Sequence, residues 1–210
     1  MANYCTYAEI KTAMPDSQLV QMGTTQHENA FNALITRASR LIDKEVGRWQ
    51  NYFYPTTDGE ARYYDGSGND ELWIDECLSV TSLGVAESGE TCSTGYTTWT
   101  STEYQAWPYN YSALSQPILR LDIDVNGDKG TWTRFRKAIK LTGVFGYSST
   151  PPEDIKQACI IQVVRWYMRA KQAFQDAGAS VELGQMVYVQ QLDPDIRELL
   201  HAYKIAGMVS

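Results

Sequence analysis

Two long segments, one toward each end of the chain, repeat apolar residues every three or four positions. In residues 25–49 the repeat is carried by Phe31, Leu34, Ile35, Ala38, Leu41, Ile42, Val46 and Trp49. In residues 150–178 it is carried by Ile155, Ala158, Cys159, Val163, Trp166, Tyr167, Ala170 and Phe174. Because an α-helix turns once in 3.6 residues, this spacing predicts two amphipathic helices, which we expect to pack against each other.

Polar residues mark where these helices and two shorter ones begin. A Thr followed three residues later by Glu forms a capping box, and it occurs as Thr6 with Glu9, Thr25 with Glu28 and Thr150 with Glu153. The first box predicts a short helix that ends near Met14, before Pro15. In the third box, Pro151 is expected at the first helical position. Asp193 followed by Pro194 predicts a fourth helix by the same preferences.

Between residues 51 and 149 the pattern changes to short alternating or β-branched runs, separated by Gly, Asp, Asn and Ser. The predicted strands are Glu60–Tyr64, Glu71–Ile74, Ser79–Ala86, Tyr96–Thr100, Ile118–Ile123, Thr131–Phe135 and Ile139–Phe145. Such a series is typical of an antiparallel β meander or small barrel. The segment Glu103–Gln116 is predicted to be a long loop. Its aromatic residues either fold back on the sheet or contact a partner, and they are Tyr104, Trp107, Tyr109 and Tyr111.

These patterns predict an α+β protein, in which a helical bundle formed by the N- and C-terminal helices carries a large inserted antiparallel β domain. We expect residues 1–50 to hold the N-terminal helices of the bundle and residues 51–149 to form the inserted β-rich domain. Residues 150–178 are expected to form the long bundle helix, and residues 179–210 a linker and a C-terminal helical arm. An amphipathic terminal helix suits an arm that reaches a partner, and it equally suits completion of the monomer's own bundle.

The net charge argues against sequence-independent DNA binding, and the middle of the chain contains one acidic and one basic segment. With 18 Lys and Arg against 25 Asp and Glu, the net charge is −7, which argues against a sequence-independent DNA binder. Residues 58–90 hold nine acidic residues and one basic residue, whereas Arg134, Arg136, Lys137 and Lys140 follow within seven positions. One explanation of this contrast is that both charged segments are strand faces exposed to solvent. The other is charge complementarity between neighbouring subunits of a ring, in which Asp70 and Glu71 of one subunit lie opposite the basic segment of the next.

The sequence holds no recognisable catalytic constellation, so we expect a protein that is not an enzyme and uses no metal or other cofactor. The run Asp122-x-Asp124-x-Asn126-Gly127 resembles the start of a calcium loop, but the twelfth position is Thr133 instead of Glu. Asn-Gly between β runs favours a hairpin turn. The four cysteines show no zinc spacing, although Cys77 and Cys92 could pair. No apolar run approaches the ~20 residues that span a bilayer, so we expect no membrane contact and assembly in a cytoplasm.

Several short motifs follow one another along the chain: Arg62–Gly68, Leu72–Ile74, Leu78–Leu83, Leu141–Tyr147 and Pro151–Ala158. Their order resembles that in the head-tail connector (adaptor) proteins of tailed bacteriophages. In that family, a Gly-x-aromatic-Gly-Tyr strand end typically precedes a helix start of the form Pro-(Glu)-Asp-(Ile/Val)-Lys-Gln-Ala. Residues 143–158 follow this pattern here. The resemblance runs from about residue 6 to residue 206. The β-rich middle is larger than a simple adaptor needs.

The resemblance implies a structural virion protein at the neck, under the portal vertex. Such adaptors form a homo-oligomeric ring, commonly of twelve copies, that extends the DNA channel without binding DNA specifically and docks the next neck or tail protein. Carried onto this chain, the segment that embraces the portal protein corresponds to Leu192, Pro194, Ile196, Leu199, Leu200 and Tyr203. The aromatic segment Glu103–Gln116 is the candidate for the tail-side contact.

An alternative from another class is a carbohydrate- or receptor-binding module of the neck or baseplate. Aromatic rings stack on sugars, and a β surface can present several of them in one plane. The candidate rings for this role are Trp99, Trp107, Tyr109 and Tyr111.

Overall fold

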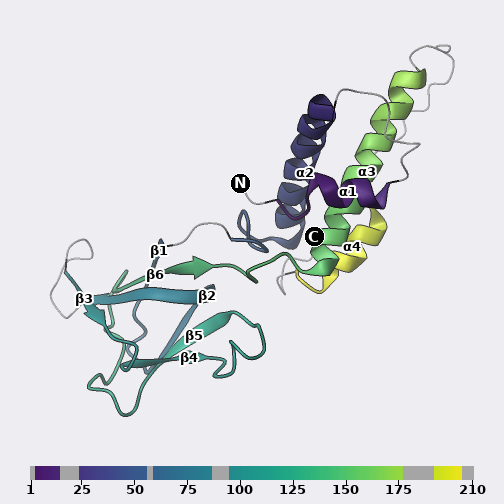
Figure 1. Ribbon diagram of the computed structural model, residues 1–210. Coiled ribbons are helices and arrows are strands. Elements are labelled where there is room, and N and C mark those ends of the chain that lie inside the picture. Colours follow the sequence, from purple (N-terminus) through teal and green to yellow (C-terminus); the bar gives the residue numbers. More distant parts are fainter. Residues whose placement is uncertain (1–2, 15–23, 56–58, 87–94, 177–191, 205–210) are drawn as a thin grey trace. The chain divides into compact units, whose positions relative to one another are not determined.

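The computed structural model describes residues 3–14, 24–55, 59–86, 95–176 and 192–204, and the chain divides into two compact units. Met1–Asn51 and Pro151–Ser210 form a helical unit, and Tyr52–Thr150 form a β unit. Figure 1 shows the elements of each unit. The helical unit contains α1 (Tyr7–Ala13), α2 (Thr24–Val46), α3 (Glu153–Asp176) and α4 (Pro194–His201).

The predicted N-terminal caps of α1 and α4 are confirmed, whereas the predicted start of α3 after Thr150 is wrong. The Thr6 side chain accepts a hydrogen bond from the Glu9 amide, while the Glu9 carboxylate accepts one from the Thr6 amide. Asp193 caps α4 by accepting from the Asp195 amide. Helix α3, however, begins at Glu153, after Pro151 and Pro152. A residue that precedes proline is pushed out of the helical region, so the double proline delays the helix start.

The apolar faces of α2 and α3 are confirmed as the centre of the helical unit. The α2 positions Phe31, Ile35, Ala38, Ile42 and Val46 are buried, as are Ile155, Ala158, Cys159 and Val163 of α3. Phe31 lies against Tyr167, with 4.6 Å between ring centroids. Figure 1 shows α2 and α3 running alongside each other. Helix α4 adds the buried side chains of Ile196 and Leu200 to this core.

The predicted architecture, a bundle of N- and C-terminal helices with an inserted β domain, is wrong. Among the described residues, α2 and α3 have 23 and 24 residues, whereas α1 has 7 and α4 has 8. Two long helices and two short ones do not make the expected bundle. The structure is instead α+β, with one six-stranded antiparallel sheet and four helices among the residues described. The repeat of apolar residues predicted which face each helix buries, but a buried face does not specify how many helices cover it.

The β unit is a single antiparallel sheet in the order β1-β6-β2-β5-β4, with β3 also paired to β2. Its strands are β1 (Glu60–Tyr64), β2 (Glu71–Ala86), β3 (Tyr96–Trp99), β4 (Tyr104–Trp107), β5 (Ile118–Ile123) and β6 (Ile139–Phe145). The two predicted runs Glu71–Ile74 and Ser79–Ala86 are one strand of 16 residues. Strand β2 therefore connects all parts of the sheet, because β3, β5 and β6 each pair with a stretch of it.

One loop prediction and one strand prediction in the β unit are wrong. Residues 104–107, which we expected in a loop, form β4 at an edge of the sheet and pair with β5. Residues 131–135 form no strand. They lie instead against the glycine-rich turn, where the Gly66 amide donates to the Phe135 carbonyl and the Trp132 amide donates to the Asn69 carbonyl. Trp132 is fully buried and stacks on Trp99 at 5.0 Å between ring centroids.

Candidate functional site

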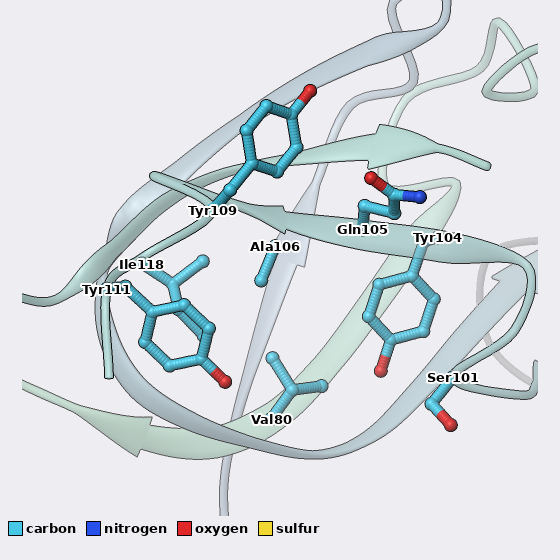
Figure 2. Close-up of a pocket in the computed structure, with 8 residues that line it drawn as sticks. All are labelled: Val80, Ser101, Tyr104, Gln105, Ala106, Tyr109, Tyr111 and Ile118. Atoms are coloured by element: carbon cyan, nitrogen blue, oxygen red, sulfur yellow. The ribbon is translucent and has the colours of Figure 1, made fainter. Parts of the chain in front are cut away.

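A pocket of about 530 Å³ lies beside β4 and contains three of the four predicted tail-side aromatic residues. It is lined by Val80, Ser101, Tyr104, Gln105, Ala106, Tyr109, Tyr111 and Ile118. Figure 2 shows the side chains of Val80, Tyr104, Ala106, Tyr111 and Ile118 turned toward one space, while Gln105 and Tyr109 point to the other side of the strand. The predicted aromatic loop therefore supplies one wall of a pocket.

The alternation of side chains along β4 explains this arrangement. Successive residues of a strand point to opposite faces of the sheet. Tyr104 and Ala106 consequently share the pocket face, and Gln105 points to the other face. Trp107, two residues after Gln105, shares that other face. Burial raises the pKa of the Tyr104 hydroxyl, and the neighbouring Tyr111 raises it further. The Tyr104 hydroxyl therefore keeps its proton at neutral pH and can donate a hydrogen bond into the pocket.

The other face of the sheet carries a row of three residues from three neighbouring strands, the Trp73–Arg120–Trp107 row. Arg120 of β5 lies opposite Trp73 of β2 and opposite Trp107 of β4 in the strand registers. Its guanidinium lies 5.4 Å from the Trp73 ring and 5.0 Å from the Trp107 ring, within cation–π range. The two indoles contact each other edge to face, with 6.2 Å between centroids. Even so, 61% of Trp73 is exposed.

Two carboxylates fix the guanidinium of this row. Arg120 Nη1 lies 2.7 Å from Glu71 Oε1, and Arg120 Nε lies 2.7 Å from Asp122 Oδ1. A further hydrogen bond of 2.8 Å joins Arg120 Nη2 to Asp122 Oδ2. Burial lowers the pKa of Arg120, but the hydrogen bond and the charge of Asp122 outweigh that effect and raise it overall. The Arg120 side chain is thus held in one orientation between the two indoles.

No model of a known protein family matches the sequence, and no curated protein matches it either. The residues and their geometry are therefore the basis for assigning a function.

Sequence reasoning missed Trp73 and Arg120 as site residues. Trp73 follows the buried Leu72 and belongs to a predicted strand, so its exposure could be anticipated from the two-residue alternation. That it meets Arg120 and Trp107 depends on the registers of three strands, for which the local pattern carries no signal.

Within one chain, the segment that contains Arg134 and Lys137 lies against the turn that contains Asp65 and Asp70. The amide of Lys137 donates to Asp65 Oδ1 at 2.7 Å, and the Trp132 indole donates to the Asp70 carbonyl at 3.0 Å. Glu71 forms its salt bridge with Arg120 of the same chain. The basic residues Arg134, Arg136 and Lys137 are exposed, Lys140 is half-buried, and Asp70 and Glu71 are exposed. The turn that contains Asp65 and Asp70 and the basic segment Arg134–Lys137 are therefore neighbours within a single subunit.

Most of the predicted portal-interface residues contribute to the helical unit itself. Leu192, Ile196 and Leu200 are buried, Leu199 and Tyr203 are half-buried, and Pro194 is exposed. The Tyr203 hydroxyl donates to Asp154 of α3 at 3.3 Å, and Lys204 donates to Glu45 of α2 at 2.8 Å. In this conformation α4 is covered on its apolar side by α2 and α3, so a partner would meet its polar side.

The carboxylates of the calcium-like run, Asp122 and Asp124, already form hydrogen bonds or ion pairs with other protein groups. Asp124 accepts from the Asn126 amide at 2.8 Å and from Gln105 at 2.6 Å, and Asp122 is paired with Arg120. Among the described residues, no group of three or more His, Cys, Asp or Glu is arranged to hold a metal ion. None of the described helices combines the length and apolar character that crossing a bilayer requires. Cys92 lies outside the described residues, so its pairing with Cys77 stays a prediction.

Asp124 is expected to make stability depend on pH at the acidic end. The hydrogen bond from the Asn126 amide holds the pKa of Asp124 below its ordinary value of 3.8, and the one from Gln105 adds to it. A lowered folded pKa gives stability that is present above the unfolded pKa and is lost as pH falls through the folded pKa. Between about pH 5 and pH 2, the urea midpoint should therefore fall less steeply in Asp124→Asn than in the wild type. Equal slopes would contradict this expectation.

Proposed function

We propose that this protein is a structural virion protein, a head-tail adaptor that forms a ring under the portal, extends the DNA channel and docks the next neck or tail protein. It acts by geometry and not as an enzyme. The order of motifs between residues 62 and 158 supports the adaptor family. The single structural observation that carries the docking role is the Trp73–Arg120–Trp107 row, in which Trp73 is exposed and the other two residues are half-buried.

The composition of this row is that of a protein-binding hot spot. Trp, Tyr and Arg dominate the residues whose truncation costs most binding energy in protein interfaces. Tyr109, of which 64% is exposed, lies at the same face, with its hydroxyl 3.5 Å from Asp122 Oδ2. Arg120 is already held by Glu71 and Asp122. A partner would therefore bind side chains that are ordered in advance, which reduces the entropy cost of association.

The exposed basic segment supports contact between copies of the ring. Arg134, Arg136 and Lys137 are exposed, and so is almost half of Phe135. A head-to-tail ring needs two different complementary surfaces on each subunit. We propose that the basic segment meets acidic residues of the neighbouring copy, for which Asp70 is a candidate because its side chain is exposed.

The ring is tested by native mass spectrometry and negative-stain imaging of the purified protein, alone and mixed with portal particles of the same virus. A twelve-membered ring, or binding to portal particles, supports the adaptor. A stable monomer or trimer that ignores portal particles contradicts it. Because a portal can template assembly, the mixture and not the isolated protein decides the question.

Trp73→Ala is expected to abolish capture of the next neck or tail protein of the same virus while leaving the fold intact. Since 61% of Trp73 is exposed, the free energy of unfolding should fall by no more than about 1 kcal/mol. Tyr63→Ala is the matched control, because Tyr63 is a second exposed aromatic residue on the same sheet, in β1. Co-sedimentation and urea unfolding measure the two effects. Equal capture by the wild type and Trp73→Ala would contradict the docking role.

A further inference from the structure

The pocket beside β4 is large enough for a ligand and is separate from the Trp73–Arg120–Trp107 row. Its volume of about 530 Å³ falls within the roughly 300–1,000 Å³ that is usual for small-molecule sites. Figure 2 shows Tyr104 and Ala106 facing it. The next residue, Trp107, contacts Arg120 and Trp73 and belongs to the opposite face. The two sites therefore share β4 but use its alternate residues, and each can be altered without the other.

The chemistry of the lining restricts the ligand class. None of the described residues that line the pocket is charged, so an anionic group such as phosphate or carboxylate finds no counter-charge there. Val80, Ala106 and Ile118 provide an aliphatic surface. Ser101, Tyr104 and Tyr111 provide hydroxyl groups, whereas Gln105 points to the other side of β4 and donates to Asp124. A pure hydrocarbon would leave these polar groups without partners, at a cost in free energy.

A neutral sugar matches both parts of this lining. A pyranose ring has C–H faces, which pack on aliphatic groups and tyrosine rings, and an edge of hydroxyls, which donate and accept hydrogen bonds. Figure 2 shows Tyr104 and Tyr111 on two sides of the space, with Val80 and Ala106 between them and Ile118 beside Tyr111. We infer that this pocket binds a neutral mono- or disaccharide, held between Tyr104 and Tyr111 on an aliphatic floor. This inference goes beyond the adaptor role and does not depend on it.

The structure also corrects which aromatic residues would hold the sugar. Trp99 is 6% exposed and stacks on Trp132 in the core, so it is not available for a ligand. Trp107 contacts Arg120 and Trp73 on the other face. Of the rings that the sequence suggested for this role, Tyr111 points into the pocket and Tyr109 points to the other side of the strand, while Tyr104 joins Tyr111.

The test is an NMR titration of the full-length protein with a panel of neutral mono- and disaccharides up to about 20 mM, a range chosen for ligands that form few contacts. At least one sugar should shift signals of residues that line the pocket. Tyr104→Phe keeps the ring and removes the hydroxyl, so it should lower the affinity for that sugar roughly three- to tenfold. Ala106→Leu narrows the pocket and should weaken binding more.

Controls distinguish binding in the pocket from binding elsewhere on the sheet. Trp73→Ala alters the opposite face and should leave sugar binding unchanged, whereas capture of the neck or tail protein should be lost. Glucose 6-phosphate should bind more weakly than glucose, because the lining offers no positive charge. The inference is overturned if no sugar of the panel shifts these signals, or if binding is the same in Ala106→Leu. Urea unfolding of each variant shows that the fold is retained.

Discussion

Gly66→Ala is expected to destabilise the β unit by more than about 3 kcal/mol, a large effect for a substitution that adds one methyl group. A Cβ atom at residue 66 would lie 1.6 Å from the carbonyl oxygen of Thr133. The backbone here has little freedom to yield, because the Gly66 amide donates to the Phe135 carbonyl at 2.9 Å and the Gly68 amide donates to the Trp132 carbonyl at 3.0 Å. The added methyl group must therefore push the turn at Gly66–Gly68 away from the segment Trp132–Phe135, to which it is hydrogen-bonded.

Separation of the two segments would also disturb the core. Trp132 lies in the held segment, is fully buried, and donates its indole N–H to the Asp70 carbonyl at 3.0 Å. Its ring stacks on Trp99 of β3. Displacement of Trp132 loses this packing, and truncation of a buried Trp typically costs about 3–5 kcal/mol. The basic segment that follows Trp132 would lose its anchor in the same step.

Urea unfolding followed by tryptophan fluorescence measures the effect, with Gly130→Ala as the matched control. A Cβ atom at residue 130 meets no heavy atom within 4 Å. Gly130→Ala should therefore change the free energy of unfolding by no more than about 0.5 kcal/mol. If the two variants unfold at the same urea concentration, the contact between Gly66 and Thr133 does not constrain the fold.

The helices illustrate what local sequence pattern can predict. The spacing of Phe31, Ile35 and Ala38 predicted a buried face on α2, and all three side chains are buried. The capping box at Thr6 predicted the start of α1 because its partner is only three residues away. The bundle was not predictable in the same way. How helices cover one another depends on contacts between distant segments, and an amphipathic stripe does not identify its partner.

The aromatic residues of the β unit show why the site was only partly predictable. Trp99 and Trp107 both lie in short strands near turns, yet one is buried in the core and the other faces Arg120. The choice depends on strand register, and a shift of one residue reverses the face of every side chain. The aromatic segment 103–116 was predicted as one loop, and its division between a pocket and an opposite face required the position of β4.

Oxidation is expected to join Cys5 and Cys159 and to stabilise the helical unit by up to about 4–5 kcal/mol. Both thiols are buried, and their sulfur atoms lie 3.3 Å apart. The Cys5 thiol donates to Cys159, which lowers the pKa of Cys159 and raises that of Cys5. Cys159 is therefore the thiol of the pair that more readily loses its proton to give the thiolate, the form that reacts. A cross-link that closes so long a loop removes much entropy from the unfolded chain, about 4.7 kcal/mol for a 100-residue loop.

Diamide accepts the two electrons and two protons that the two thiols lose when the disulfide forms. Because Cys5 and Cys159 are covered, oxidation should be slow in water and faster at urea concentrations just below the unfolding midpoint. Peptide mapping under non-reducing conditions identifies the pair, and urea unfolding with and without diamide gives the stability gain. Cys5→Ser is the control and should gain nothing. The other thiol described as buried, Cys77, lies in the β unit, where burial raises its pKa to about 11 and makes it less reactive. An equal gain in Cys5→Ser would assign the stabilisation to another cysteine and contradict the pairing inferred from the packing of Cys5 on α3.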